Sequence, residues 1–224
     1  MFASRRPHSL ALLALPLALL LLFVPILACA EPDPLIELQQ RWAEINYETP
    51  ENQRREAFGE LAEQADQLVA ANPEDARLLT WQGIIYSTWA GTGGLKALGR
   101  AKAARRAFER AIEIDEQILA GSAHTSLGVL YHEVPGWPIG FGDQNLARQH
   151  LERGLALNPD GIDSNYFFGK FLLDRKHLAE AGVRLRHALE APDRPGRELA
   201  DRGRREEVRQ ALQTLEQKLA ARRR

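Results

Sequence analysis

One spacing of small and large residues recurs along this chain, and it restricts the fold more than any other feature. The clearest copy reads H-x2-L-G-x2-Y over residues 124–131 and A-x3-L-x2-G-x4-P over residues 147–159. Residues three and four positions apart share one face of a helix, so each half predicts one helix. Small residues near the centre allow two helices to approach closely, and the large apolar residues fill the space between neighbouring pairs. We therefore expect an antiparallel pair of helices over residues 121–159.

Two further copies extend the pattern on both sides. Residues 165–172 read N-x2-F-G-x2-L, and residues 181–188 read A-x3-L-x2-A ahead of a proline at position 192. Residues 79–86 read L-x3-G-x2-Y, and residues 104–111 read A-x3-F-x2-A. Three copies in series predict a repeat protein in which each hairpin covers the apolar face of the next.

Proline-containing turns separate the copies. They fall at residues 72–73, 158–161 and 191–196. Proline lacks a backbone donor and disfavours helix in the residue before it, so helices are expected to end there. Asp75 and Asp163 follow two of these turns and are expected to be N-caps of the next helices.

The recurring pattern resembles the tetratricopeptide repeat (TPR), a 34-residue helical hairpin with W-x2-L-G-x2-Y on its first helix and an A-x3-F-x2-A pattern, then Pro, on its second. The resemblance implies an all-α fold, a TPR-like helical-hairpin solenoid with a solvated C-terminal capping helix at residues 197–224. The repeats lie within residues 31–196. They are expected at 76–115, 121–159 and 162–192, after a degenerate repeat at 48–73 whose first helix lies near residues 35–45 and buries Trp42.

The N-terminus has the pattern of an export segment. Two arginines at positions 5 and 6 precede the apolar run Leu10–Leu27, and Ala-Cys-Ala at positions 28–30 supplies small residues around a cleavage site. We expect a signal peptide at residues 1–30 and a periplasmic or secreted protein. In the alternative, Cys29 is lipidated and the protein is lipid-anchored, so a membrane is contacted only through the signal segment or the lipid.

Composition and motifs argue against several function classes. The formal net charge is −1 and no dense Lys/Arg field spans the repeats, so no nucleic-acid partner is expected. No nucleophile–base arrangement is present, so we expect no catalysis and no cofactor. His132 and Glu133 lack the second histidine of a helical zinc motif, so no metal is expected. The glycine run at 91–96 predicts a flexible turn, and His150, His177 and His187 are expected at the surface.

One face of the first helices is expected to line the concave groove of the solenoid. It mixes apolar, hydroxyl and single charged side chains, which suits a peptide or protein segment better than a polyanion. Phe168 and Phe171 instead fit core positions of the repeat. The predicted partner-binding groove consists of Thr80, Ile84, Thr125, Val129, His132, Tyr166 and Lys170.

Two expanded turns fall at the same point of successive repeats, at residues 88–94 and 134–143. Each carries a tryptophan beside glycines, and such loops commonly carry function on a rigid scaffold. We expect them to form one recognition surface along an edge of the solenoid. In the alternative, Trp137 and Phe141 fold back and plug the open end of the hairpin. The predicted partner-binding loop residues are Trp89, Trp137, Phe141 and Asp143.

The second turn also resembles exported T-component proteins of tripartite ATP-independent periplasmic (TRAP) transporters. The resemblance covers residues 122–158 and rests on a proline-containing turn that ends in Gly-Asp before an A-x3-L helix. Phe141 stands where that family tends to have glycine. The resemblance implies an all-helical repeat protein that partners a substrate-binding protein.

These observations predict an exported scaffold that binds another protein without catalysis. In the alternative, the chain is an accessory subunit of a periplasmic TRAP solute-uptake system that associates with a solute-binding protein. The groove or a pore would then also contact a small apolar ligand.

Overall fold

The computed structural model describes residues 33–222 of the chain. The predicted signal peptide, its cleavage site and Cys29 lie outside the described residues. None of the helices that are described is both long enough and apolar enough to cross a membrane.

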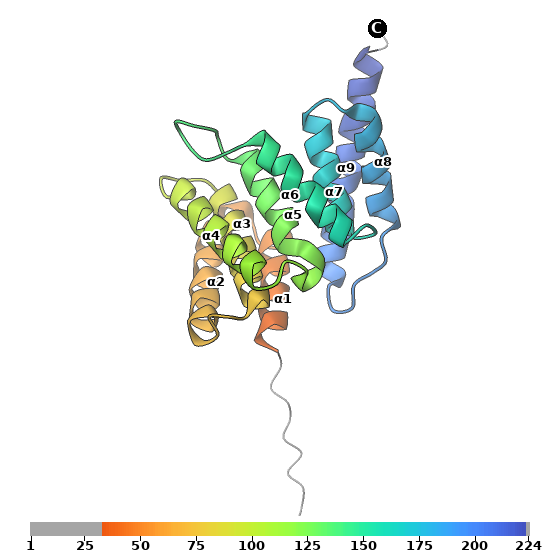
Figure 1. Ribbon diagram of the computed structural model, residues 1–224. Helices are drawn as coiled ribbons and strands as arrows, with labels where there is room; N and C mark the ends of the chain where they lie inside the picture. The colour runs from red at the N-terminus through yellow and green to blue at the C-terminus, as the bar shows by residue number, and fades with distance from the viewer. Residues whose placement is uncertain (1–32, 223–224) are drawn as a thin grey trace, which may run out of the picture. The chain divides into compact units, whose positions relative to one another are not determined.

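Residues 33–222 form an all-α array of helical hairpins, which confirms the predicted fold class. Nine helices and no strand occur in this range: α1 Pro34–Tyr47, α2 Glu51–Ala71, α3 Ala76–Gly91, α4 Ala97–Asp115, α5 Ile118–Glu133, α6 Gln144–Leu157, α7 Ile162–Asp174, α8 Leu178–Glu190 and α9 Glu198–Arg222. The hairpins α1–α2, α3–α4, α5–α6 and α7–α8 follow one another in chain order, and α9 packs on the last of them (Figure 1).

One of the two expected N-caps is present. The carboxylate of Asp75 accepts hydrogen bonds from the backbone amides of Arg77 and Leu78, at 2.9 and 3.4 Å. The expectation for Asp163 is wrong, because Gly161 is the N-cap residue of α7 and Asp163 lies within its first turn. This carboxylate binds arginines from the C-terminal part of the chain instead.

The small residues of the repeat pattern mark the closest approaches between helices. A Cβ added to Gly128 of α5 would lie 2.7 Å from Cγ of Leu151 and 3.0 Å from the carbonyl oxygen of Ala147, both in α6. Such distances leave no room for a methyl group. Glycine at this position therefore lets the two helices of the hairpin pack in contact.

The degenerate first repeat is present with Trp42 buried, as predicted. The indole of Trp42 packs edge-on against Trp81 of α3 with ring centroids 5.9 Å apart. Its Nε1 donates a hydrogen bond to Oγ1 of Thr88 at 3.0 Å. A buried indole usually has this donor satisfied, and these contacts join α1 to α3.

The C-terminal helix does more than cap the array. From its middle onward, α9 buries Val208, Ala211 and Leu215 in the hydrophobic core that includes α8. Its first half reaches the other end of the array, where Ala200 joins the core of α1, α2 and α3. A Cβ added to Gly203 would lie 2.4 Å from the ring of Tyr47 in α1. The predicted cap is therefore correct, but its return to α1 was not predicted.

We expect the close approach at Gly128 to be energetically important. Gly128→Ala would force α5 and α6 apart and destabilise the fold by roughly 1–3 kcal/mol, the usual cost of overpacking. Gly99 of α4 is the matched control, since nothing lies within 4 Å of its added Cβ. Gly99→Ala should stabilise the helix by about 0.5–1 kcal/mol. Urea denaturation of both variants tests this, and shifts of the same sign would contradict the assigned packing.

Candidate functional site

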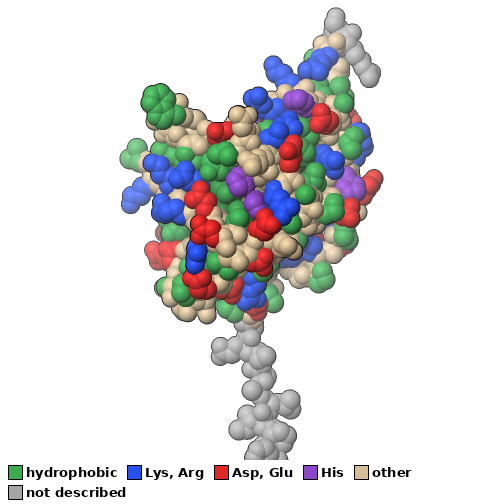
Figure 2. Space-filling view, in the orientation of Figure 1, with side chains coloured by type: hydrophobic (Ala, Val, Ile, Leu, Met, Phe, Trp, Pro, Cys, Tyr) green, Lys and Arg blue, Asp and Glu red, His purple; other side chains and the backbone are tan. Residues whose placement is uncertain are grey.

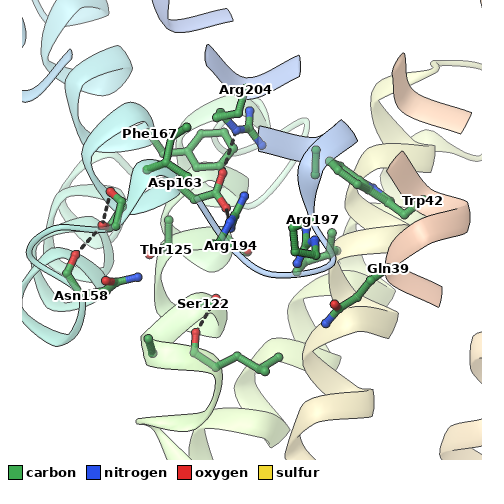
Figure 3. A pocket seen from close by; sticks show the side chains of 18 of the residues that line it. Gln39, Trp42, Ser122, Thr125, Asn158, Asp163, Phe167, Arg194, Arg197 and Arg204 are labelled. Atoms are coloured by element: carbon green, nitrogen blue, oxygen red, sulfur yellow. Dashed lines mark hydrogen bonds and ion pairs between the residues drawn. The ribbon is translucent and has the colours of Figure 1, made fainter. Parts of the chain in front are cut away.

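The concave side of the array holds a cavity of about 400 Å³. Helices α1, α3, α5 and α7 each contribute side chains to its wall, and the start of α9 with the segment before it lines the remaining side (Figure 3). Without this segment the concave side would be an open groove between the first and last hairpins. Its lining includes Trp42, Trp81, Ile84, Thr125, Val129, Phe167 and Arg197.

An ion-pair network holds the closing segment on the array. Asp163 of α7 accepts from Nε of Arg204 at 2.7 Å and from a terminal nitrogen of Arg194 at 2.6 Å. Asp201 accepts from the backbone amide of Arg194 at 2.8 Å and from its Nε at 2.7 Å. The two arginines therefore connect the linker and α9 to α7.

The charges of this network stabilise one another. Burial alone would raise the pKa of Asp163, but the neighbouring Arg204 and Arg194 lower it well below the usual range of an aspartate. Burial likewise works against the charge on Arg204, yet Asp163 raises the pKa of this guanidinium. Asp163 is thus an anion at neutral pH, and it pairs with two cations.

The opposite wall of the cavity contains an unusual backbone conformation. Leu119, Ala120 and Gly121, at the start of α5, have positive φ angles of 49°, 52° and 72°. For residues that carry a Cβ, this conformation costs about 1–2 kcal/mol each. Leu119 and Ala120 line the cavity, and the carbonyl of Leu119 accepts a hydrogen bond from Oγ of Ser122 at 2.6 Å. The strained segment therefore forms part of the cavity wall.

Three of the predicted groove residues line the cavity, and one, Thr80, offers no surface to it. Ile84, Thr125 and Val129 contribute to the wall. Thr80 is fully buried and its hydroxyl donates to the carbonyl of Ala76 at 2.7 Å, so it offers no groove surface. Tyr166 is largely buried, with the guanidinium of Arg204 4.8 Å from the centre of its ring. It lines a smaller pocket together with Val129, His132 and Lys170. The repeat pattern gives the correct face for these residues but not their depth.

The two remaining groove residues belong to a polar network outside the cavity. Nδ1 of His132 lies 2.8 Å from Oε1 of Gln144, and its Nε2 lies 3.2 Å from Oδ2 of Asp174. Lys170 donates to the same oxygen of Asp174 at 2.8 Å. His132, Glu133 and Asp174 bring atoms that can bind a metal within 4.8 Å of one another. Lys170 already pairs with this carboxylate, so the network is balanced by the protein's own charges.

The first expanded turn is shorter than predicted, because α3 continues to Gly91. Trp89 therefore lies on a helix, and a Cβ added to Gly59 of α2 would lie 3.1 Å from its indole. The guanidinium of Arg100 lies 3.8 Å from the centre of its ring. These contacts place Trp89 in the packing between repeats, so its predicted role in an exposed loop is wrong.

The second expanded turn divides the remaining loop residues into two groups. Phe141 folds back, edge-on to Tyr131 with ring centroids 5.9 Å apart, and Asp143 caps α6 through the amides of Asn145 and Leu146. Trp137 and Ile139 project outward with 90% and 72% of their surface exposed. Figure 2 shows hydrophobic groups protruding where Figure 1 draws the α5–α6 loop.

The α5–α6 loop has an internally bonded base. The amide of Gly142 donates to the carbonyl of Pro135 at 3.0 Å, and the amide of Asp143 donates to that of Tyr131 at 3.0 Å. A Cβ added to Gly140 would lie 2.4 Å from the carbonyl oxygen of Pro135. These glycines therefore serve close backbone packing, and the loop presents Trp137 from a fixed base.

His150 is not the surface residue that the sequence indicated. Its Nδ1 lies 2.9 Å from Nδ1 of His124, and its ring stacks on Tyr131. Burial, together with the nearby His124, lowers the pKa of His150 to about 4. The two histidines are therefore a neutral hydrogen-bonded pair between α5 and α6 at physiological pH.

The fold agrees with that of known repeat proteins. No protein-family model matches the chain, and no curated protein matches it. A thermophilic TPR protein of Thermus thermophilus has a similar structure, with a TM-score of 0.52 at 16% identity over 80% of this chain and 97% of its own. The array thus has the fold of TPR proteins.

Two other solved structures align less well. The TPR protein YrrB, described as having an unusual peptide-binding site, has a TM-score of 0.43 at 18% identity, over 81% of this chain and 83% of its own. MamA has a TM-score of 0.33 at 18% identity, over 65% of this chain and 95% of its own.

The network around Asp163 predicts a specific acid sensitivity. Since its pKa is lower in the folded chain than in the unfolded chain, Asp163 stabilises the fold above pH about 4 and loses this contribution as the pH falls further. We expect Asp163→Asn to lower the free energy of unfolding at pH 7 by roughly 1–3 kcal/mol. The variant should also show a shallower loss of stability between pH about 5 and 2.

Asp160→Asn is the control for this prediction. Asp160 lies in the turn just before α7 and pairs with His187, but it is largely exposed, and such pairs contribute little. Thermal unfolding across this pH range measures both variants. Parallel stability curves for Asp163→Asn and the unmodified protein would contradict the role given to Asp163.

Proposed function

We propose that this protein is an exported, non-catalytic scaffold that binds another protein through the α5–α6 loop. The supporting observation is the outward projection of Trp137 and Ile139 from a loop whose base is fixed by backbone hydrogen bonds. Large exposed apolar side chains on one tip commonly mark a contact surface. Export remains a proposal from the N-terminal sequence pattern.

The segment before α9 lies along the concave side, which favours binding of a partner at the loop edge of the array over binding along the groove. A peptide bound along the groove would need the space that the Arg194–Arg204 segment occupies. The α5–α6 loop lies outside this closure and remains accessible. The loop, and not the predicted groove, is therefore the proposed partner-binding surface.

The loop has the composition of an interaction hot spot. Tryptophan is enriched among residues whose truncation costs 2 kcal/mol or more in binding. A contact presented from a fixed base also loses less conformational entropy on binding than one on a mobile segment. Phe141 supports the loop from below by packing on Tyr131 and under Arg105. Trp137 is therefore the proposed contact, and Phe141 its support.

The second candidate function is an accessory subunit of a TRAP solute-uptake system. It is favoured by the proline-containing turn that ends in Gly142-Asp143, since the same segment forms the protruding loop. In that case the protein bound at Trp137 would be a solute-binding protein. At the α5–α6 loop, the two candidates differ in the identity of the partner.

Photo-crosslinking at the loop tip tests the proposal. Trp137→p-benzoylphenylalanine, introduced in the full chain in the cells that produce it, should give one discrete protein adduct in the exported fraction. Val183 on α8 is also exposed and is the matched control position. Mass spectrometry of the adduct identifies the partner, and a solute-binding protein would favour the TRAP alternative. Similar adducts at both positions, no adduct at 137, or an intracellular adduct would contradict the proposal.

Two alanine variants separate contact from support. Trp137→Ala should weaken binding of the crosslinked partner by about 2 kcal/mol or more and leave the free energy of unfolding within about 0.5 kcal/mol. Phe141→Ala should lower the melting temperature, because it removes a packed ring. Calorimetry and thermal unfolding measure the two effects. A large loss of stability in Trp137→Ala would show that this side chain serves the fold.

A further inference from the structure

Arg197 differs from the other two arginines at the cavity wall. Arg194 pairs with Asp163 and Asp201, and Arg204 pairs with Asp163 and Glu207. Arg197 forms no ion pair with any residue between 33 and 222, and its buried Nε has no hydrogen-bond acceptor there. One guanidinium of the wall is thus left without a carboxylate.

This arrangement is unfavourable for the protein alone. Buried polar groups are almost always hydrogen-bonded, and partly buried charges are usually paired. Burial and the nearby cation Arg194 lower the pKa of Arg197, whereas Asp163 and Asp201 act in the opposite direction without contacting it. An anion that enters from solution would supply the missing acceptor.

Backbone and ring contacts hold Arg197 at the wall of the cavity. It directly precedes α9, and its backbone amide donates to the carbonyl of Arg194 at 3.0 Å, within the segment that Asp163 and Asp201 hold. Its guanidinium carbon lies 4.9 Å from the centre of the Trp81 ring. Figure 3 shows the Arg197 side chain between Trp42 and Arg194, at the cavity.

The remainder of the wall fits an apolar body. Trp42, Trp81, Ile84 and Phe167 line the cavity together with the hydroxyl-bearing residues of α5. The volume of about 400 Å³ is at the lower end of the range for sites that bind small molecules, roughly 300–1,000 Å³. A molecule with one anionic group and a compact apolar part would satisfy both Arg197 and these walls.

We propose that the cavity binds a small organic monocarboxylate, with its carboxylate on Arg197 and its apolar part against Trp42, Trp81 and Phe167. This site is separate from the loop surface at Trp137, so it does not depend on the proposed protein partner. A volume of about 400 Å³ suits a compact free acid better than the end of an extended peptide.

Calorimetric titration with benzoate, 2-naphthoate and hexanoate, and with the uncharged 2-naphthamide, tests the proposal on the chain from Glu31 onward. We expect at least one of the three carboxylates to bind, and 2-naphthamide to bind about tenfold or more weakly than 2-naphthoate, since a charge-assisted hydrogen bond is lost. Arg197→Gln should reduce carboxylate affinity by a similar factor. Arg202→Gln, at a largely exposed position in the first turns of α9, should leave it unchanged.

The unliganded proteins provide an independent readout. The Arg197 guanidinium contacts the ring of Trp81 but forms no ion pair with any residue between 33 and 222. Arg197→Gln should therefore unfold at about the same temperature as the unmodified chain, or higher. A loss of binding therefore cannot be attributed to a failure to fold. A lower melting temperature for Arg197→Gln would show that Arg197 is a structural residue.

Three results would overturn the proposal. They are the absence of binding by all three carboxylates at millimolar concentration, equal affinities for 2-naphthoate and 2-naphthamide, and unchanged carboxylate affinity in Arg197→Gln. If a peptide with a free C-terminal carboxylate displaces the bound acid, the ligand is a chain terminus and the proposed free acid is wrong.

The crosslinking experiment at Trp137 tests a different surface, so its failure would leave all of these binding results unchanged.

Discussion

The contact of α9 with α1 and α7 decides what the concave side of this protein can hold. It joins residues from the two ends of the array, since Gly203 packs on the ring of Tyr47 and Arg204 pairs with Asp163. Hydrophobic burial contributes at both ends of the helix, through Ala200 and through Val208. If this contact were absent, the first and last hairpins would be joined only through the repeats between them.

Closure changes the chemistry of the concave surface. An open solenoid groove offers a long contact for an extended peptide. Here the segment from Arg194 to Arg204 occupies that space and leaves a cavity of about 400 Å³. The same segment brings Arg197 to the cavity, where its buried Nε has no acceptor among residues 33–222. The surface for a protein partner is consequently expected at the edge, where the α5–α6 loop presents Trp137.

The sequence predicts the parts of this structure that depend on local spacing. Gly128 and Leu151 lie at matching points of two adjacent helices, and the i, i+3 and i+4 pattern is sufficient to pair them. The same pattern places Trp42 inside and Phe168 and Phe171 in the core. A local pattern gives the face of a helix but not how deeply a side chain is buried. Thr80 therefore fits the predicted groove in sequence, although in the structure it is buried and its hydroxyl donates to the carbonyl of Ala76.

Other features depend on contacts that no local pattern encodes. Tyr47 and Gly203 meet across most of the chain, and neither residue signals the other. Asp163 has the local sequence of an N-cap, but its partners Arg194 and Arg204 lie 31 and 41 residues further along the chain. Trp89 lies within α3 because the helix ends only at Thr92. The backbone amide and the hydroxyl of Thr92 both donate hydrogen bonds to the carbonyl of Trp89. The unpaired state of Arg197 is visible only once its neighbours are known.

A distance measurement between α1 and α9 tests the closure most directly. Glu48 and Arg202 are exposed, and their side chains meet at 3.9 Å. The chain from Glu31 onward holds no cysteine, so Glu48→Cys and Arg202→Cys allow two spin labels to be placed without further changes. Pulsed electron paramagnetic resonance should then give one narrow distribution at the short limit of the method. A broad distribution centred at long distances would show that α9 does not return to α1, and would contradict the closed cavity.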